Sequence, residues 1–291
     1  MFRKLLVRPA HKVLGRLGLE LRYKEAEAVP TQLTTLEDPC DAIYQHGDVA
    51  FEVPLAKCRY PFHFSYDPLG WHPFVQTLKQ YQENPELCYR DSVLHEFYTK
   101  HQPKSLLEAF FGTSLEVPAE VSADLSSLAK LAIPQYEPFF PWDPKKPTAK
   151  GEKGLDSAHG HQGFGPVSDD KGELELLRLT KTYESIKANG YQPGHGHDGD
   201  IRGYLLKRGG DYRFIIRQGL HRAAVLSAMD YTHIRVRFFD PYPRAIFEAE
   251  LPNWPQVKRG VMSQKAAERI FMMFFKENGT EKARRIGLIA E

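Results

Sequence analysis

The sequence predicts an α+β protein whose most regular part is a mixed-sheet core in the C-terminal half. Between residues 172 and 240, a helical pattern is followed by two strand patterns, a short helical pattern and a third strand pattern. At 42% hydrophobic and 26% charged residues, the 291-residue chain has the composition of a globular protein. It is long enough to bury a sizeable core and to add extensions at both ends of that core.

The core itself is expected over residues 157–240, with a C-terminal helical extension over 241–291. Asn189-Gly190 ends the first helix, and Gly209-Gly210 forms the turn between the first two strands. Ser263 caps the closing helix of the extension. The expected elements of the core are a helix at Glu173–Lys187, strands at Asp200–Leu206 and Asp211–Ile216, a helix at Leu220–Ala228 and a strand at His233–Phe239.

The preceding range, 25–156, is an aromatic-rich region in which two helices are expected, at His72–Asn84 and Ser92–His101. The proline-interrupted stretch Tyr136–Pro144 cannot form a regular element, and we expect it to be an aromatic loop lying across a surface. The polar, Gly- and Lys-rich stretch Lys145–Ser157 is expected to be a connector.

The charge and hydrophobic pattern of residues 1–24 predicts a basic amphipathic helix. Seven basic residues against Glu20 give this segment a charge of +6, and its apolar residues recur every three or four positions. Such a helix can lie at a membrane surface or dock on a partner. It can equally pack on its own domain with the basic face in water.

Composition excludes several classes of protein. The 39 Lys+Arg against 37 Asp+Glu give a formal charge of +2, too balanced to indicate a nucleic-acid-binding protein. No apolar stretch approaches the ~20 residues that a bilayer crossing needs. The three cysteines contain no CxxC pair, so neither a disulfide scaffold nor a cysteine zinc site is expected. We expect a cytoplasmic protein, with peripheral contact at the inner face of the membrane if residues 1–24 bind lipid.

The junction between the second strand and the short helix has the strongest chemical signal. Gly219 permits a tight turn, and the helix that follows presents unpaired N–H groups and its positive dipole end. His221 and Arg222 fall in the first turn of that helix, so the junction predicts an anion site, most plausibly for phosphate. In the alternative interpretation, Arg222 pairs with a carboxylate and His221 is a partly buried histidine.

The order of these elements, with the segments SIKANGY, DIRGYLL and DYRFIIRQGLHRAAVLSAMDYTHIRVRF, resembles the ParB/sulfiredoxin-like superfamily. The resemblance covers residues 172–240 and implies binding of ATP or another nucleoside triphosphate with Mg²⁺. It implies that His221 and Arg222 hold phosphate, that Gly219 is the turn glycine, and that Arg178 and Ser185 contact nucleotide phosphates. The alternative for Arg178 and Ser185 is an ordinary solvated helix surface.

Some residues of this chain differ from the motifs of the superfamily, and these differences limit the activities that we expect. Sulfiredoxins carry a reactive cysteine where this chain has Leu220, so reduction of a sulfinic acid by that route is not expected. The sequence motifs that partition proteins and free-serine kinases carry at the turn glycine are not matched either. The kinases nevertheless show that the scaffold can transfer phosphate to a small hydroxyl group. The chain is similar to a divergent branch associated with bacterial surface-polysaccharide gene clusters.

Two further groups of residues carry possible chemistry. The pairs His159-Gly-His161 and His195-Gly-His197 flank the first core helix, and Asp198 and Asp200 follow the second pair. These side chains can bind a transition metal, or the two aspartates can hold the Mg²⁺ of a nucleotide. A polar, glycine-rich surface loop fits the same pattern.

Glu173 and Glu175 open the first core helix, and either can act as a catalytic base for an acceptor hydroxyl. They can also simply complement the helix dipole.

The leading functional interpretation is a nucleotide-binding protein that hydrolyses a nucleoside triphosphate or transfers phosphate to a small hydroxylated substrate such as a sugar. The second is a non-catalytic scaffold of polysaccharide assembly held at the membrane by residues 1–24. The third is a nucleic-acid-binding or nuclease protein that uses the arginines of the last two strands, although these lack the interleaved aromatic residues typical of such surfaces.

Overall fold

The computed structural model describes residues 38–112, 125–133, 139–144, 155–194, 199–240 and 242–290. These residues all belong to one compact unit, Thr35–Glu291. The predicted basic helix over residues 1–24 lies outside the described residues, as do positions 145–154 of the predicted connector. Within the described residues, no helix is both long and apolar enough to cross a membrane.

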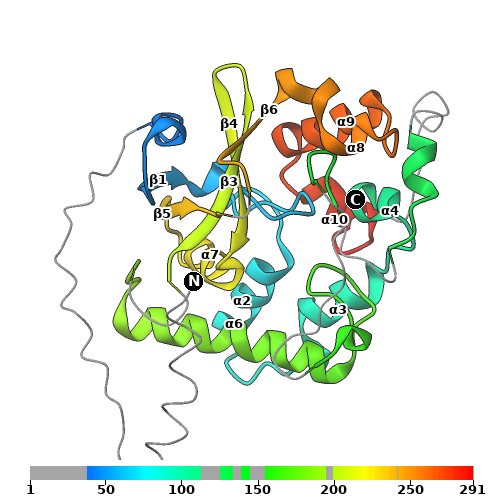
Figure 1. Cartoon of the computed structure of the whole chain (residues 1–291). Coiled ribbons are helices and arrows are strands. Elements are labelled where there is room, and N and C mark those ends of the chain that lie inside the picture. The colour runs from blue at the N-terminus through cyan, green and yellow to red at the C-terminus, as the bar shows by residue number, and fades with distance from the viewer. Residues whose placement is uncertain are drawn as a thin grey trace, which may run out of the picture. The chain divides into compact units, whose positions relative to one another are not determined.

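The fold is α+β, as predicted, and is organised around a six-stranded mixed sheet in the described part of the chain (Figure 1). The strand order is β1-β5-β3-β4-β2, and β6 lies beside β3. The strands are β1 (Ala50–Pro54), β2 (Cys58–Arg59), β3 (Ile201–Arg208), β4 (Asp211–Gln218), β5 (His233–Phe238) and β6 (Ala245–Phe247).

Strand β3 is the centre of this sheet. One edge pairs antiparallel with β4, while the other pairs parallel first with β5 and then with β6. Gly203 lies at the point where the β3–β4 register shifts, and a Cβ there would approach the Ile215 carbonyl oxygen to 2.0 Å. A residue with any side chain would therefore push the two central strands apart.

The sheet draws strands from three of the four predicted ranges. Strands β1 and β2 come from 25–156, β3 to β5 come from 157–240, and β6 comes from 241–291. The range 157–240 is thus completed on both sides by strands that lie far away in the sequence.

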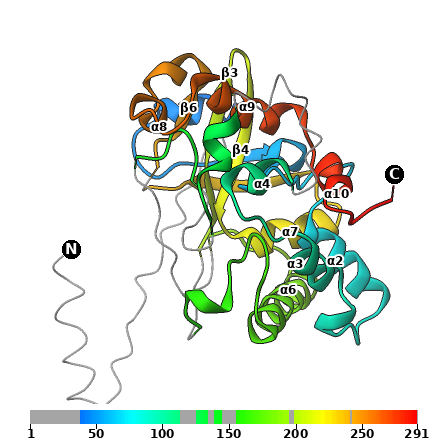
Figure 2. The same ribbon diagram turned by 90° about the vertical axis from the view of Figure 1, so that its right-hand side faces the viewer.

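Helices gather in two groups toward opposite ends of the β3–β4 hairpin (Figures 1 and 2). Helix α7 packs against β3, and both α2 and α6 pack against α7, whereas α9 packs against β4. The α-helices are α2 (Pro73–Glu83), α3 (Val93–Lys100), α4 (Leu106–Phe111), α6 (Asp169–Asn189), α7 (Leu220–Ala228), α8 (Pro255–Lys258), α9 (Gln264–Lys276) and α10 (Thr280–Arg285). Short 3₁₀ helices are η1 (Asp41–Tyr44), η2 (Leu55–Lys57), η3 (Tyr89–Asp91), η4 (Ser157–His159) and η5 (Glu248–Asn253).

Most predicted elements are confirmed, and α7 has the predicted bounds. Helix α6 begins four residues earlier than predicted, because Ser168 caps it by accepting a hydrogen bond from the N–H of Lys171. It ends at Gly190, whose φ of +73° suits glycine. Ser263 caps α9 as expected, and the apolar stripe of α9 is buried.

The described part of the predicted aromatic loop, residues 139–144, is irregular as expected but does not lie on a surface. Phe139, Phe140 and Trp142 are all buried, and the Phe140 and Trp142 rings stack with centroids 5.0 Å apart. The Trp142 indole donates a hydrogen bond to the hydroxyl of Tyr204 on β3, at 3.0 Å. The large apolar area of these rings favours burial, and the irregular backbone allows them to reach the core from outside the sheet.

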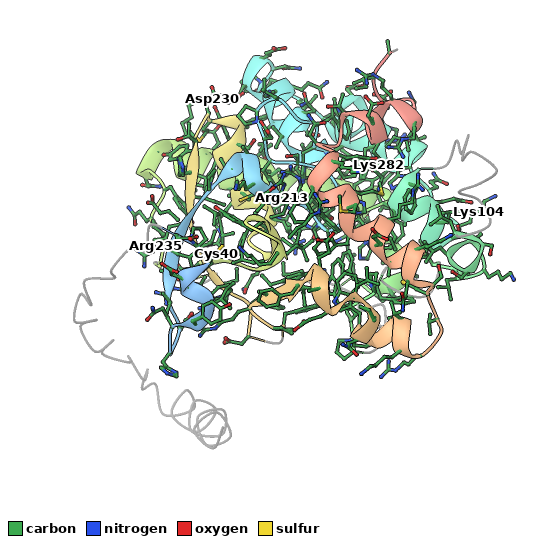
Figure 3. The ribbon with its side chains drawn as sticks, turned by 90° about the horizontal axis from the view of Figure 1, so that it is seen from above. Cys40, Lys104, Arg213, Asp230, Arg235 and Lys282 are labelled. Atoms are coloured by element: carbon green, nitrogen blue, oxygen red, sulfur yellow. The ribbon has the colours of Figure 1, made fainter. Side chains whose placement is uncertain are left out.

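Lys282, on α10, is a lysine that is fully buried in this core (Figure 3). Its Nζ donates to the carbonyl oxygens of Phe62 and Ala109 and lies 4.9 Å from the centre of the Phe64 ring. Burial lowers the pKa of Lys282 to about 7. The side chain therefore joins three segments of the chain at one buried point.

Three buried histidines make the stability of the fold sensitive to acid. Burial lowers the pKa of His72 to about 3, and it lowers the pKa of both His63 and His101 well below its usual value. Between pH 6.5 and these depressed values, the unfolded chain binds protons that the folded protein excludes. The free energy of unfolding should thus fall as the pH drops below 6.5, with a slope that approaches about 1.4 kcal/mol per histidine per pH unit.

Urea denaturation at pH 7.5, 6.5 and 5.5 measures this loss, which should be about 3 kcal/mol for three histidines between pH 6.5 and 5.5, because each is already half protonated in the unfolded chain at pH 6.5. His72→Asn keeps a side chain that can cap α2 and should remove about one third of the pH dependence. His233→Asn changes an exposed histidine and serves as the control. Equal pH dependence in the two variants would contradict the prediction.

Candidate functional site

A pocket of about 460 Å³ opens where the end of β4 turns into α7, beside the middle of α6. Its volume is in the range of small-molecule sites. Two of its walls come from elements that the sequence predicted, and the third comes from the loop before α6. The described lining residues are Gln162, Arg178, Lys181, Thr182, Arg217, Gln218, Gly219, Leu220, His221 and Arg222.

Gly219 forms the turn at the bottom of this pocket. Its φ of +84° places it in the left-handed region, and an added Cβ would lie 3.0 Å from the Ile201 side chain and 3.2 Å from the Arg222 guanidinium. The first helical hydrogen bond of α7 runs from the Ala223 N–H to the Gly219 carbonyl. No side chain in the described part of the chain caps α7, so the N–H groups of its first turn face the pocket end of the helix.

Glu175 is the buried centre that holds the pocket walls together. Its side chain has no solvent exposure. One carboxylate oxygen accepts from Lys171 Nζ and from an Arg178 guanidinium nitrogen, both at 2.7 Å. The other oxygen accepts from His221 Nε2 and from Gln162 Nε2, both at 2.8 Å. This one group therefore links α6, α7 and the loop before α6.

These partners decide what Glu175 can do. Burial acts to raise the pKa of Glu175, but the hydrogen bond from His221, together with the charge and hydrogen bond of Lys171, outweighs burial and holds the pKa far below its usual value. A carboxylate that is ionised and fully engaged is a poor proton acceptor. These contacts favour a positioning role for Glu175 over the predicted role of catalytic base.

Two contacts fix the orientation of the His221 ring. Because ionised Glu175 accepts from Nε2, the neutral ring carries its proton on that nitrogen and leaves Nδ1 as the acceptor. The ring stacks on Phe74 at the start of α2, with centroids 5.3 Å apart and an interplanar angle of 23°. The side chain keeps 20% exposure, on the pocket side.

Arg222 borders the pocket and also holds the start of β3. Its guanidinium donates to the carbonyl oxygens of Gly199 and Asp200. The structure thus brings four of the predicted binding residues, Arg178, Gly219, His221 and Arg222, to one cavity.

Two other predicted residues on α6 do not line it. Ser185 is exposed one turn beyond Thr182, and Glu173 is exposed two positions before the buried Glu175. Both lie on the part of the helix that faces solvent. The structure therefore gives Glu173 no contact with the pocket from which it could act as a base.

Of the two predicted metal ligands, Asp200 is within the described residues, and it does not line the pocket. Asp198, with His195 and His197, lies outside the described residues. The buried side chain of Asp200 faces Arg237 on β5, with 2.5 Å between the charged atoms. Among the described residues, no group of three or more potential ligands is placed to hold a metal ion.

The first histidine pair has local structural roles. His159 Nδ1 lies 2.8 Å from the hydroxyl of Ser168, the residue that caps α6. His161 Nδ1 accepts from the Gly163 N–H, and its ring stacks on Phe164. Both histidines therefore shape the loop that carries Gln162 to the pocket.

Sequence reasoning missed Gln162, Lys181 and Thr182. The two α6 residues follow Arg178 by three and four positions, which places all three on one helix face. That spacing was available as a signal once Arg178 had been singled out. Gln162 had no comparable signal, because its position depends on the fold of an irregular loop.

The charged side chains among the described lining residues of the pocket are all basic. Arg178, Lys181, Arg217 and Arg222 line it, and none of its described lining residues is acidic. The charge of Glu175 behind the wall is offset by the buried ammonium of Lys171, 2.7 Å away. Arg178 is also paired to Glu175, and a described lining whose charged side chains are all basic suits an anion.

Comparisons of the chain with models of protein families, with curated proteins and with solved structures found no match. The functional argument therefore depends on the geometry and charge of the pocket.

Substitution of Gly219 should test the turn at the bottom of the pocket. Gly219→Ala forces a side chain into the left-handed region and into contact with Ile201, and it should lower the free energy of unfolding by about 2 kcal/mol or more. Gly209→Ala is the matched control, because Gly209 also has a positive φ but an added Cβ meets no atom within 4 Å. Gly209→Ala should lower the free energy of unfolding by only about 1 kcal/mol. Chemical denaturation compares the two, and equal losses would contradict the importance of the close contacts.

Removal of the Glu175 charge should be costly. Glu175→Gln leaves Lys171 and Arg178 buried without their counter-ion, so the free energy of unfolding should fall by about 3 kcal/mol. Urea denaturation at pH 7.5 measures the loss. Glu173→Gln removes an exposed charge from the same helix and should change stability by less than about 0.5 kcal/mol. A stable Glu175→Gln protein would show that the network does not hold the walls together.

Proposed function

We propose that this protein binds the phosphate groups of a nucleotide in the pocket between α6 and α7. We further propose that it hydrolyses a nucleoside triphosphate or transfers its terminal phosphoryl group to a small hydroxyl acceptor. The observation that carries the proposal is the set of four cationic side chains that line one cavity at the N-terminus of α7, with no acidic residue among the described lining residues. Helix N-termini and arginine side chains are the groups by which proteins hold phosphate.

The residues divide into direct and indirect roles. Arg178, Lys181 and Arg222 supply charge to phosphate oxygens, and Gly219 lets the backbone approach them. Glu175 acts through others, because it fixes His221 and Arg178 while remaining buried. In phosphoryl transfer, most of the catalytic effect comes from this kind of fixed charge around the transferred group.

His221 is the side chain to which we assign proton transfer. Its Nδ1 is the acceptor nitrogen that the Glu175 hydrogen bond leaves available, and the residue lines the pocket. The acceptor hydroxyl would lose its proton there as its oxygen bonds to phosphorus and the bond between the terminal phosphate and its leaving oxygen breaks.

A magnesium ion held by the protein does not fit the described residues at this site. The Glu175 carboxylate is fully engaged, and Asp200 is paired with Arg237. In this proposal any Mg²⁺ arrives bound to the nucleotide, and no step is assigned to a protein-held ion.

The acceptor we propose is a small hydroxylated molecule such as a sugar, in line with the resemblance to proteins linked to surface-polysaccharide gene clusters. The arginines of the sheet offer a weaker case for nucleic-acid binding. Arg213 pairs with Asp211, and Arg237 pairs with both Asp48 and Asp200. Their charges are thus already offset within the fold.

Ligand-dependent stability tests the binding step. ATP, GTP or CTP with Mg²⁺ at about a hundred times its Kd should stabilise the fold by roughly 2.7 kcal/mol. Arg222→Ala should abolish this stabilisation, because Arg222 borders the pocket. Lys181→Gln should weaken it without a loss of stability, because Lys181 is exposed and forms no ion pair with the described residues.

Lys187→Gln is the matched control, since Lys187 is also exposed on α6 but does not line the pocket. Circular dichroism establishes that each variant is folded. Release of inorganic phosphate, with and without a panel of monosaccharides, then separates hydrolysis from transfer. Stabilisation by nucleotide that is unchanged in both pocket variants would refute the assignment of the site.

A further inference from the structure

We infer that the pocket recognises the polyphosphate chain of its ligand and not the base. The ligand class is accordingly any compound with two or more linked phosphoryl groups, including inorganic pyrophosphate and triphosphate. The inference rests on the proposed function and makes it more specific.

The chemistry of the lining is the first argument. A nucleobase is usually held by apolar or aromatic side chains together with a few placed polar groups. Leu220 is the single apolar side chain among the described lining residues, which include no Phe, Tyr or Trp, and one face of the His221 imidazole is covered by Phe74. The remaining side chains are cations, amides, a hydroxyl and an imidazole, which are groups that bind phosphate oxygens.

Two aromatic rings, those of Phe74 and Tyr242, contact lining residues and are packed against other side chains. The Phe74 ring stacks on one face of His221. The Tyr242 ring packs on Arg217, with the guanidinium carbon 5.2 Å from the ring centre, and stacks on Tyr204 at 5.0 Å. Within the described residues, neither ring lines the pocket, so neither offers a base a surface to stack on.

The amount of charge is the second argument. One phosphoryl group carries about −1.5 to −2 charges at pH 7. The lining holds four cations, of which Arg178 also pairs with Glu175, and together with the N-terminus of α7 they suit two or three linked phosphates better than one. The cations come from α6 (Arg178, Lys181), β4 (Arg217) and α7 (Arg222), so they surround the cavity instead of clustering at one point.

Isothermal titration calorimetry on the full chain tests the inference. The ligands are pyrophosphate, tripolyphosphate, ATP, GTP, CTP, orthophosphate and adenosine, each with Mg²⁺. We expect the Kd values of tripolyphosphate, ATP, GTP and CTP to agree within about tenfold, and pyrophosphate to displace ATP. Orthophosphate should bind at least about tenfold more weakly than pyrophosphate, and adenosine should not bind.

A charge variant provides an independent readout. Lys181→Gln should raise the Kd values of tripolyphosphate and of ATP by the same factor, roughly fivefold to tenfold, because it removes one contact to phosphate. Lys187→Gln should change neither.

The outcomes separate this inference from the proposed function. If ATP binds in a way that depends on Arg222 but tripolyphosphate does not bind, or if one nucleotide is preferred by a hundredfold, the inference is wrong and the proposed function stands. If no phosphorylated ligand binds at all, the proposed function fails, and the inference fails with it. Binding of adenosine would likewise overturn the inference.

Discussion

The buried carboxylate of Glu175 is the interaction on which the candidate site depends. It is an ionised group without solvent exposure, and such a group is tolerated only when hydrogen bonds and opposite charges replace its water. Here the replacements are themselves parts of the pocket. Arg178 and His221 are fixed because they satisfy Glu175, so the requirement for a stable core and the requirement for a defined site are met by the same contacts.

The sheet supplies the second constraint. Strand β3 has partners along both edges, and α7 lies against it, so the turn at Gly219 is held between the end of β4 and the beginning of β3. Arg222 strengthens this arrangement by reaching back to the carbonyl groups at the start of β3. The position of the helix N-terminus is therefore determined by the most highly connected strand of the fold.

The sequence was most informative where structure is local. The bounds of α7, the cap of α9 and the tight turn at Gly219 all depend on residues a few positions apart, and the structure places them as predicted. Burial was harder to foresee, because it depends on distant partners. Glu175 looked like a candidate base until the structure placed it beneath Lys171, Gln162 and His221.

The same reason explains the errors in the N-terminal half. Strands β1 and β2 contain five and two residues, too few for a clear periodicity, and they gain their structure from β5 and β4. The aromatic residues of 139–144 were correctly expected to be irregular, but their packing against Tyr204 comes from a strand more than 60 positions away. Prolines can show that a segment is not a helix or a strand, but they do not show which face of the protein it covers.

The pairing of β1 with β5 has a consequence for how the chain is made. Pro54 lies opposite His233 in this pairing, a separation of 179 residues (233 minus 54). At 5–20 residues per second, a ribosome needs on the order of 10–40 s to add them. During that interval Phe51 and Val53, which are fully buried in the finished sheet, have no strand to pair with. The nascent chain thus carries an apolar strand that needs protection from aggregation until its partner has been synthesised.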